Sequence, residues 1–217
     1  MKRIAGISII FIVLFQVASC TQPKNNNALH ENYTLMNQHL DTITLGAGCF
    51  WCVEAIFQQL KGVYSVESGY SGGSVKNPSY KEVCTGTTGH AEVCQITYDT
   101  QEISFTEILE VFWKTHDPTT PDRQGGDIGP QYRSAVFYHN NEQKKLAEEM
   151  KAKLDAAGVW DDPMVTEVTA FTVFYKAEDY HQEYYFQNTR QPYCSAVITP
   201  KLEKFRKVFA DKLKESK

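Results

Sequence analysis

The segment from Gly46 to Glu54 contains the residues best suited to covalent chemistry, Cys49 above all. A β-prone alternation at 42–45 predicts a strand before it, and apolar residues spaced three and four apart predict a helix after it. The glycines between these elements permit a tight turn, so Cys49 should lie in the first turn of the helix. There the unpaired backbone N–H groups and the helix dipole favour the thiolate, which is the nucleophilic form of cysteine. We therefore predict that Cys49 is a nucleophile and that Phe50 and Trp51 wall an apolar pocket over its sulfur.

Cys49 and Cys52 have two alternative interpretations, as buried core residues or as one half of a zinc site. A structural zinc site needs a second pair of Cys or His ligands at a characteristic spacing, and none follows in this sequence. The spacing of the histidines fits no metal site either, so we predict orienting or structural roles for His90, His116 and His181. The sequence thus predicts no metal site, and the function proposed below from the family resemblance needs no organic cofactor.

The elements that must position Cys49 are strands and helices in irregular alternation. Further strands are predicted at 63–70, 92–98, 134–138 and 165–172, and further helices at 104–113, 141–157, 177–186 and 201–213. The Gly- and Pro-rich segment 118–131 predicts a long loop, and such loops inside compact domains often carry functional residues. This mixture predicts a single α/β or α+β domain.

Residues 1–19 have the pattern of a secretory signal, with basic residues followed by an apolar run and then small residues. The apolar run is shorter than the roughly 20 residues that a membrane span needs. Val17-Ala18-Ser19-Cys20 resembles a bacterial lipobox, so we predict lipidation of Cys20; a plain signal peptide is the alternative. The polar stretch 20–38 predicts a flexible tether, followed by a catalytic domain at 39–217. The predicted location is the cell envelope, outside the cytoplasm, with a lipid anchor as the only membrane contact.

The composition narrows the class of protein further. The chain has 217 residues, 42% hydrophobic and 22% charged, as in ordinary globular proteins. A net charge of -4 gives no basic surface for nucleic acid. Of six cysteines, five remain besides Cys20, and an odd number outside the cytoplasm predicts at least one working thiol. Cys84 and Cys94 have apolar neighbours and are predicted to lie in the core.

Short motifs extend the pattern around Cys49 across most of the chain. After Gly-Cys-Phe-Trp at 48–51 come Gly-Tyr-Ser-Gly-Gly at 69–73, Asn-Pro-Ser-Tyr at 77–80, Val-Cys-Thr-Gly at 83–86, Thr-Gly-His-Ala-Glu-Val at 88–93, His-Asp-Pro at 116–118, Gln-Gly-Gly-Asp at 124–127, Gln-Tyr-Arg-Ser at 131–134 and Ala-Glu-Asp-Tyr-His-Gln at 177–182. One such motif is weak evidence. The ordered set, from about Thr44 to Phe205, resembles the type A peptide methionine sulfoxide reductases.

The resemblance implies a fold, a reaction and a set of roles. The fold is a single domain with a mixed β-sheet flanked by helices, of ferredoxin-like type. The reaction is reduction of methionine S-sulfoxide, free or in proteins. Cys49 matches the nucleophile that attacks the sulfoxide sulfur, and Glu92 matches the acid that protonates its oxygen. A carboxyl group in an apolar pocket stays protonated, which suits that role. The other matched residues are Tyr80 and Tyr132, which hold the oxygen, Asp127, which supports the polar side, and Phe50 and Trp51, which surround the S-methyl group.

Loss of methionine would leave Cys49 as a sulfenic acid, which another thiol must resolve. The family commonly has this thiol near the C-terminus, which favours Cys194. Many members have glycine where this chain has Cys52, so the Cys-x-x-Cys pair with Cys49 is a departure and makes Cys52 the alternative. Direct reduction by an outside thiol is the third possibility. The resemblance also implies a thioredoxin-like reductant, and we expect a monomer.

Two other functions remain open from the sequence. The first is a thiol-disulfide oxidoreductase that uses Cys49 and Cys52 and has no need of Glu92. The second is a lipoprotein binding module in which Cys49 is locked in a stable disulfide.

Overall fold

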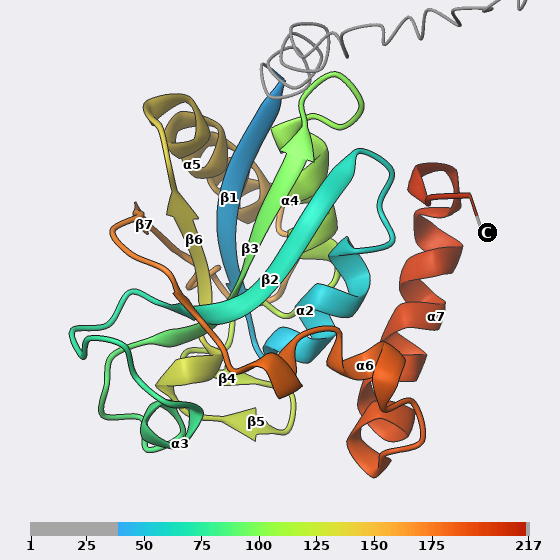
Figure 1. Cartoon of the computed structure of the whole chain (residues 1–217). Helices are drawn as coiled ribbons and strands as arrows, with labels where there is room; N and C mark the ends of the chain where they lie inside the picture. The colour runs from blue at the N-terminus through green and yellow to red at the C-terminus, as the bar shows by residue number, and fades with distance from the viewer. Residues whose placement is uncertain (1–38, 216–217) are drawn as a thin grey trace, which may run out of the picture.

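A six-stranded mixed sheet forms the centre of the molecule (Figure 1). The computed structural model describes residues 39–215. The strand order is β7-β6-β1-β3-β2-β8, and every neighbouring pair is antiparallel except β6 and β7. The strands are β1 (Leu40–Ala47), β2 (Val63–Ser71), β3 (Ala91–Asp99), β6 (Ser134–Tyr138), β7 (Glu167–Ala170) and β8 (Tyr175–Lys176). The prediction of one domain with a mixed sheet is confirmed.

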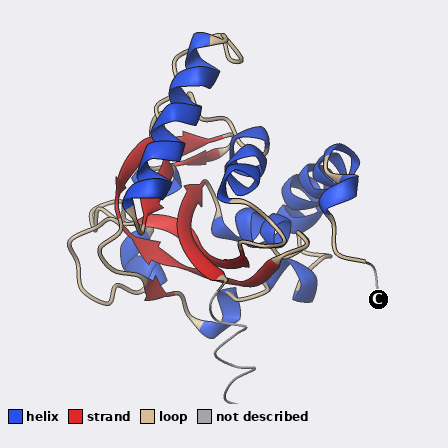
Figure 2. Ribbon diagram, turned by 90° about the horizontal axis from the view of Figure 1, so that it is seen from above, coloured by secondary structure: helices blue, strands red, loops and turns tan. Residues whose placement is uncertain are grey.

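The helices pack on one face of this sheet, as the view from above shows (Figure 2). They are α2 (Phe50–Phe57), α4 (Phe105–Lys114), α5 (Asn141–Ala156) and α7 (Thr199–Val208). Their apolar side chains join those of the central strands in one large core. A smaller cluster around Val93 and Phe137 lies on the opposite face, where Phe171 and Phe174 pack against it. Because side chains alternate along a strand, β3 directs Glu92 and Cys94 towards α2 and Val93 away from it.

The predicted elements are present, most of them with shifted ends, and the helix predicted at 201–213 ends at Val208. Two further segments differ from the prediction. The loop at 118–131 contains a small hairpin, β4 (Arg123–Gln124) and β5 (Asp127–Ile128), followed by the 3-10 helix η1 (Pro130–Tyr132). The helix predicted at 177–186 is broken into the 3-10 helix η2 (Asp179–His181) and the short helix α6 (Tyr184–Gln187). Glu183 between them has a left-handed backbone, with φ of 52°. The Gln182 side chain bonds both the N–H and the C=O of Ser68 at 3.0 Å, which ties this segment to β2 instead of a helix.

Three short helices complete the fold: α3 (Tyr80–Val83), the π-helix η3 (Cys194–Ile198) and the 3-10 helix η4 (Ala210–Lys212). The predicted signal segment, the lipidation site Cys20 and the tether lie outside the described residues. Within 39–215, no helix combines the length and the apolar character that a membrane crossing requires.

Candidate active site

Cys49 is the N-cap of α2, directly after the end of β1. Gly48 makes the turn with φ of 86°, and a Cβ atom there would meet the Gln124 side chain at 2.6 Å, so only glycine fits. The Cys49 C=O accepts the N–H of Cys52 at 3.0 Å, which closes the first turn of the helix. The Cys49 side chain is buried, with 8% exposed. The predicted position at the start of a helix is confirmed.

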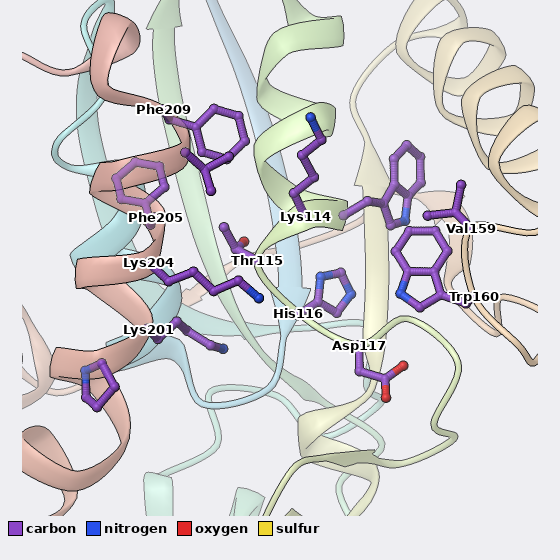
Figure 3. Close-up of a pocket in the computed structure, with 13 residues that line it drawn as sticks. Lys114, Thr115, His116, Asp117, Val159, Trp160, Lys201, Lys204, Phe205 and Phe209 are labelled. Atoms are coloured by element: carbon purple, nitrogen blue, oxygen red, sulfur yellow. The ribbon is translucent and has the colours of Figure 1, made fainter.

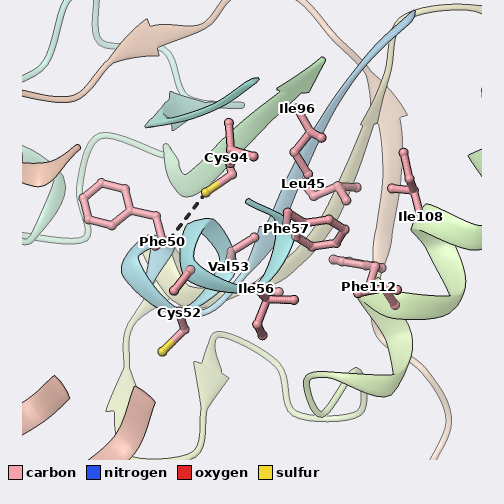
Figure 4. Close-up of a cluster of buried hydrophobic side chains, with 14 of the residues drawn as sticks. Leu45, Phe50, Cys52, Val53, Ile56, Phe57, Cys94, Ile96, Ile108 and Phe112 are labelled. Carbon is pink, nitrogen blue, oxygen red and sulfur yellow. Dashed lines mark hydrogen bonds between the residues drawn. The ribbon is translucent and has the colours of Figure 1, made fainter. Parts of the chain in front are cut away.

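Two side chains of strand β3 form hydrogen bonds with the backbone of Phe50, the first residue of α2. Glu92 Oε2 accepts the Phe50 N–H at 3.1 Å. The Cys94 thiol donates to the Phe50 C=O at 3.5 Å, which is the dashed line in Figure 4. Glu92 and Cys94 are two positions apart and therefore lie on the same face of the strand. The carboxyl group of Glu92 is thus fixed next to Cys49 by the helix start that also carries the thiol.

The Glu92 carboxyl group is protonated at neutral pH. Burial raises its pKa to about 8, against the effect of the Phe50 N–H, and the charge of Asp127 adds to the increase. The side chain is 1% exposed. Its second oxygen has no hydrogen-bond partner within the described residues, which leaves it available to a bound oxygen atom.

Cys49 is a thiol in this resting site, contrary to the thiolate expected from its position at the helix start. Burial raises its pKa well above the usual value, and the thiol of Cys52 and the charge of Glu92 act in the same direction. Desolvation therefore outweighs the helix dipole here. Both the Cys49 thiol and the neighbouring Glu92 carboxyl group therefore carry their protons.

Aromatic rings form the apolar wall predicted at Phe50 and Trp51. Phe50 is buried, and the Trp51 indole stacks on Tyr184 with ring centroids 3.7 Å apart. Trp51 Nε1 donates to Nδ1 of His181 at 3.1 Å, so the proton of this neutral imidazole lies on Nε2. Burial lowers the pKa of His181, which keeps the ring neutral. The Tyr80 ring also faces the His181 ring, with centroids 4.4 Å apart.

Tyr80 and Tyr132 are partly buried and lie near enough to Glu92 for its charge to act on both. Burial and then the charge of Glu92 raise the pKa values of Tyr80 and Tyr132, so both remain hydrogen-bond donors. Glu178 positions Tyr80 by accepting its backbone N–H at 2.9 Å and also accepts the Tyr70 hydroxyl at 2.9 Å. The sequence placed Glu178 in a motif but assigned it no role.

Asp127 supports the site through a residue that sequence reasoning missed. Asp127 Oδ2 accepts the Tyr193 hydroxyl at 2.6 Å. The Tyr193 ring meets Trp51 edge-on, with centroids 6.0 Å apart, and the pKa values of both Cys49 and Cys52 respond to its hydroxyl. Its place next to Cys194 in Gln-Pro-Tyr-Cys was the only available signal.

The comparisons with known proteins agree with this arrangement. Residues 41–213 match the family described as "Peptide methionine sulfoxide reductase". The chain belongs to this family. MsrA of Saccharolobus solfataricus is 55% identical over 81% of this chain and 98% of its own length, and MsrA of Trichodesmium erythraeum is 53% identical over 80% and 98%. Among solved structures, reduced Mxr1 from Saccharomyces cerevisiae has a TM-score of 0.66 and 33% identity, over 72% of this chain and 90% of that one.

This member of the peptide methionine sulfoxide reductases is an oxidoreductase that uses thiols to reduce methionine sulfoxide. The other cysteines that the structure describes differ in their exposure to solvent. Cys94 and Cys194 are fully buried, and the core position predicted for Cys94 is confirmed. Cys84 is exposed, contrary to prediction, because it caps the four-residue helix α3 at the surface.

The histidines of the reductase have orienting contacts. His90 Nδ1 accepts the Gly73 N–H at 3.1 Å, and its Nε2 lies 2.7 Å from the Val75 carbonyl oxygen. His116 lies between the Phe112 carbonyl and the Ser134 hydroxyl, at 2.6 and 2.7 Å. No cluster of three or more potential metal ligands occurs in residues 39–215.

Proposed function

We propose that Cys49 reduces the S epimer of methionine sulfoxide, free or in proteins, with Glu92 as the acid. The observation that carries the proposal is the pairing of a buried thiol with a buried, protonated carboxyl group at one helix start inside an aromatic pocket. Phe50 and Trp51 would enclose the S-methyl group, while Tyr80 and Tyr132 would donate to the oxygen.

The proposed reaction uses the proton of the Glu92 carboxyl group and the proton of the Cys49 thiol. Glu92 donates a proton to the sulfoxide oxygen while the sulfur of Cys49 attacks, and the thiol proton of Cys49 restores the carboxyl group. The S–O bond of the substrate breaks, methionine leaves, and the oxygen stays on Cys49 as a sulfenic acid. A second thiol then displaces this oxygen as water and forms a disulfide.

We propose Cys52 as the resolving thiol on the basis of its position, although the family pattern favours Cys194. The Cys49 thiol lowers the pKa of Cys52, as do the Lys201 ammonium and the Tyr193 hydroxyl. Burial raises the pKa of Cys194. A thiol three residues from Cys49 on one helix turn also needs little rearrangement to reach it.

One turnover without reductant distinguishes these two thiols. We expect tryptic mass spectrometry to find a disulfide within the peptide that carries both Cys49 and Cys52, with no crosslink to the peptide that carries Cys194. Cys52→Ser should then lose thioredoxin-supported turnover while Cys194→Ser keeps it, and dithiothreitol should support both variants. A first disulfide to the Cys194 peptide would contradict this assignment.

The electron donor is proposed to be a thioredoxin-like dithiol protein, and the enzyme is proposed to act as a monomer. The test of the function uses residues 35–217 with dithiothreitol and a racemic methionine sulfoxide peptide. Consumption of half the racemate supports the proposal. Consumption of the whole racemate would contradict the epimer preference, and no consumption would contradict the function.

The location is proposed from residues 1–38 alone: export through 1–19, lipidation of Cys20 and attachment to a membrane of the cell envelope. In a bacterial host the full chain should incorporate a labelled fatty acid and fractionate with membranes. Cys20→Ser should remove the label and release the protein from the membrane fraction. Equal labelling of both forms would contradict lipidation at Cys20.

A further inference from the structure

A groove of about 600 Å³ lies between the end of α4, the loop after α5 and the helix α7 (Figure 3). None of the residues proposed to bind the sulfoxide lines it. His116 forms part of its floor, fixed by its bonds to Phe112 and Ser134. Lys201 and Lys204 extend from α7 into the groove, opposite Trp160.

The groove is apolar inside and at its edges. Trp160, Phe205 and Phe209 contribute aromatic surface to its walls. Val159 and Val208 lie beside them with 54% and 52% of their surface exposed, although both are apolar. Exposed apolar side chains gathered around a groove are typical of a protein interaction site.

The charge of the groove is positive on a chain whose net charge is -4. Lys201 and Lys204 have no ion-pair partner within residues 39–215. Lys114 is paired with Glu110 at 2.7 Å, and the single lining carboxylate, Asp117, accepts bonds from Thr119. Two ammonium groups are therefore available to an acidic partner, which favours association through complementary charge.

One wall of the groove is connected to the helix that carries Cys49 and Cys52. Helix α7 begins directly after η3, which contains Cys194, and both elements pack against α2. The charge of Lys201 acts on Cys52 and also on His116 in the floor. The α7 wall of the groove therefore packs against the helix that carries Cys49 and Cys52, the two thiols proposed to form the enzyme disulfide.

We propose that this groove is the docking surface of the dithiol protein that reduces the enzyme disulfide, and that this partner presents acidic residues around an apolar prominence. The inference rests on the proposed function. In the reaction, a thiolate of the partner attacks one sulfur of the enzyme disulfide and forms a mixed disulfide. The second partner thiol then displaces the enzyme, so the partner becomes a disulfide and the enzyme regains two thiols, with transfer of two electrons and two protons.

The test measures turnover of the sulfoxide peptide with purified bacterial thioredoxin, its reductase and NADPH, and separately with dithiothreitol. Lys204→Glu is expected to raise the KM for thioredoxin about fivefold, with a smaller difference at high salt. Trp160→Ala should raise the same KM through lost apolar contact. Neither change should alter turnover with dithiothreitol, which needs no docking surface.

Lys207→Glu is the matched control, because it makes the same charge change on an exposed residue of α7 that does not line the groove. An equal rise in KM for Lys204→Glu and Lys207→Glu would overturn the proposal, since net charge alone would then explain the effect. Thioredoxin-supported turnover absent from the unmodified chain would overturn it as well. If the proposed function itself is wrong, turnover with dithiothreitol will also be missing. This result distinguishes that failure from failure of the docking proposal.

Discussion

Replacing Cys49 with serine is expected to abolish sulfoxide reduction, with a loss on the order of 10⁴ or more in kcat. A serine hydroxyl fits the space of the thiol but cannot take the oxygen from the substrate and return it as water. The measurement is methionine formation from a sulfoxide peptide with dithiothreitol, which bypasses the resolving thiol and the protein donor.

Cys194→Ser is the control for this loss, because dithiothreitol bypasses the resolving step and Cys194 is not proposed to contact the substrate. It should retain the activity of the unmodified enzyme. Substantial turnover by Cys49→Ser would contradict the assignment and would make Cys52 the candidate nucleophile.

The local structure around Cys49 was predictable because neighbouring residues determine it. A strand, a glycine turn and an amphipathic helix around Cys49 follow from neighbouring residues, and the structure has them in that order. The helix predicted at 104–113 is likewise present, and Ser104 and Glu107 begin it with the two hydrogen bonds of a capping box. Elements with such strong local signals are the most predictable part of a fold.

The features that were missed depend on contacts between distant segments. Tyr193 reaches Asp127 across 66 positions of the chain, and no local pattern reveals that bond. The break at Glu183 arises because Gln182 bonds to Ser68, 114 residues away. The protonation of Cys49 also depends on tertiary burial, because helix position alone predicted the opposite state.

Glu92→Gln is expected to lower kcat by about 10² to 10³, the usual contribution of general acid catalysis. Glutamine still accepts the Phe50 N–H, so the start of α2 keeps its anchor, but it has no proton to give to the sulfoxide oxygen. Because the acid must be protonated, the rate of the unmodified enzyme should fall as the pH rises through about 8. The residual rate of Glu92→Gln should lack this decline.

The same substitution should stabilise the fold at high pH, which separates a catalytic role from a structural one. The pKa of Glu92 is about 8 in the folded chain and near 4.5 when unfolded, so folding takes up a proton between these values. The contribution of the Glu92 side chain to the free energy of unfolding is therefore complete below about pH 4.5 and declines as the pH rises towards 8. Chemical denaturation at pH 9 should show Glu92→Gln to be more stable than the unmodified chain, by up to a few kcal/mol, and this difference should disappear near pH 4. Equal activity in both proteins at pH 7 would contradict the assignment of Glu92 as the acid, and lower stability of the variant at pH 9 would contradict its protonated state.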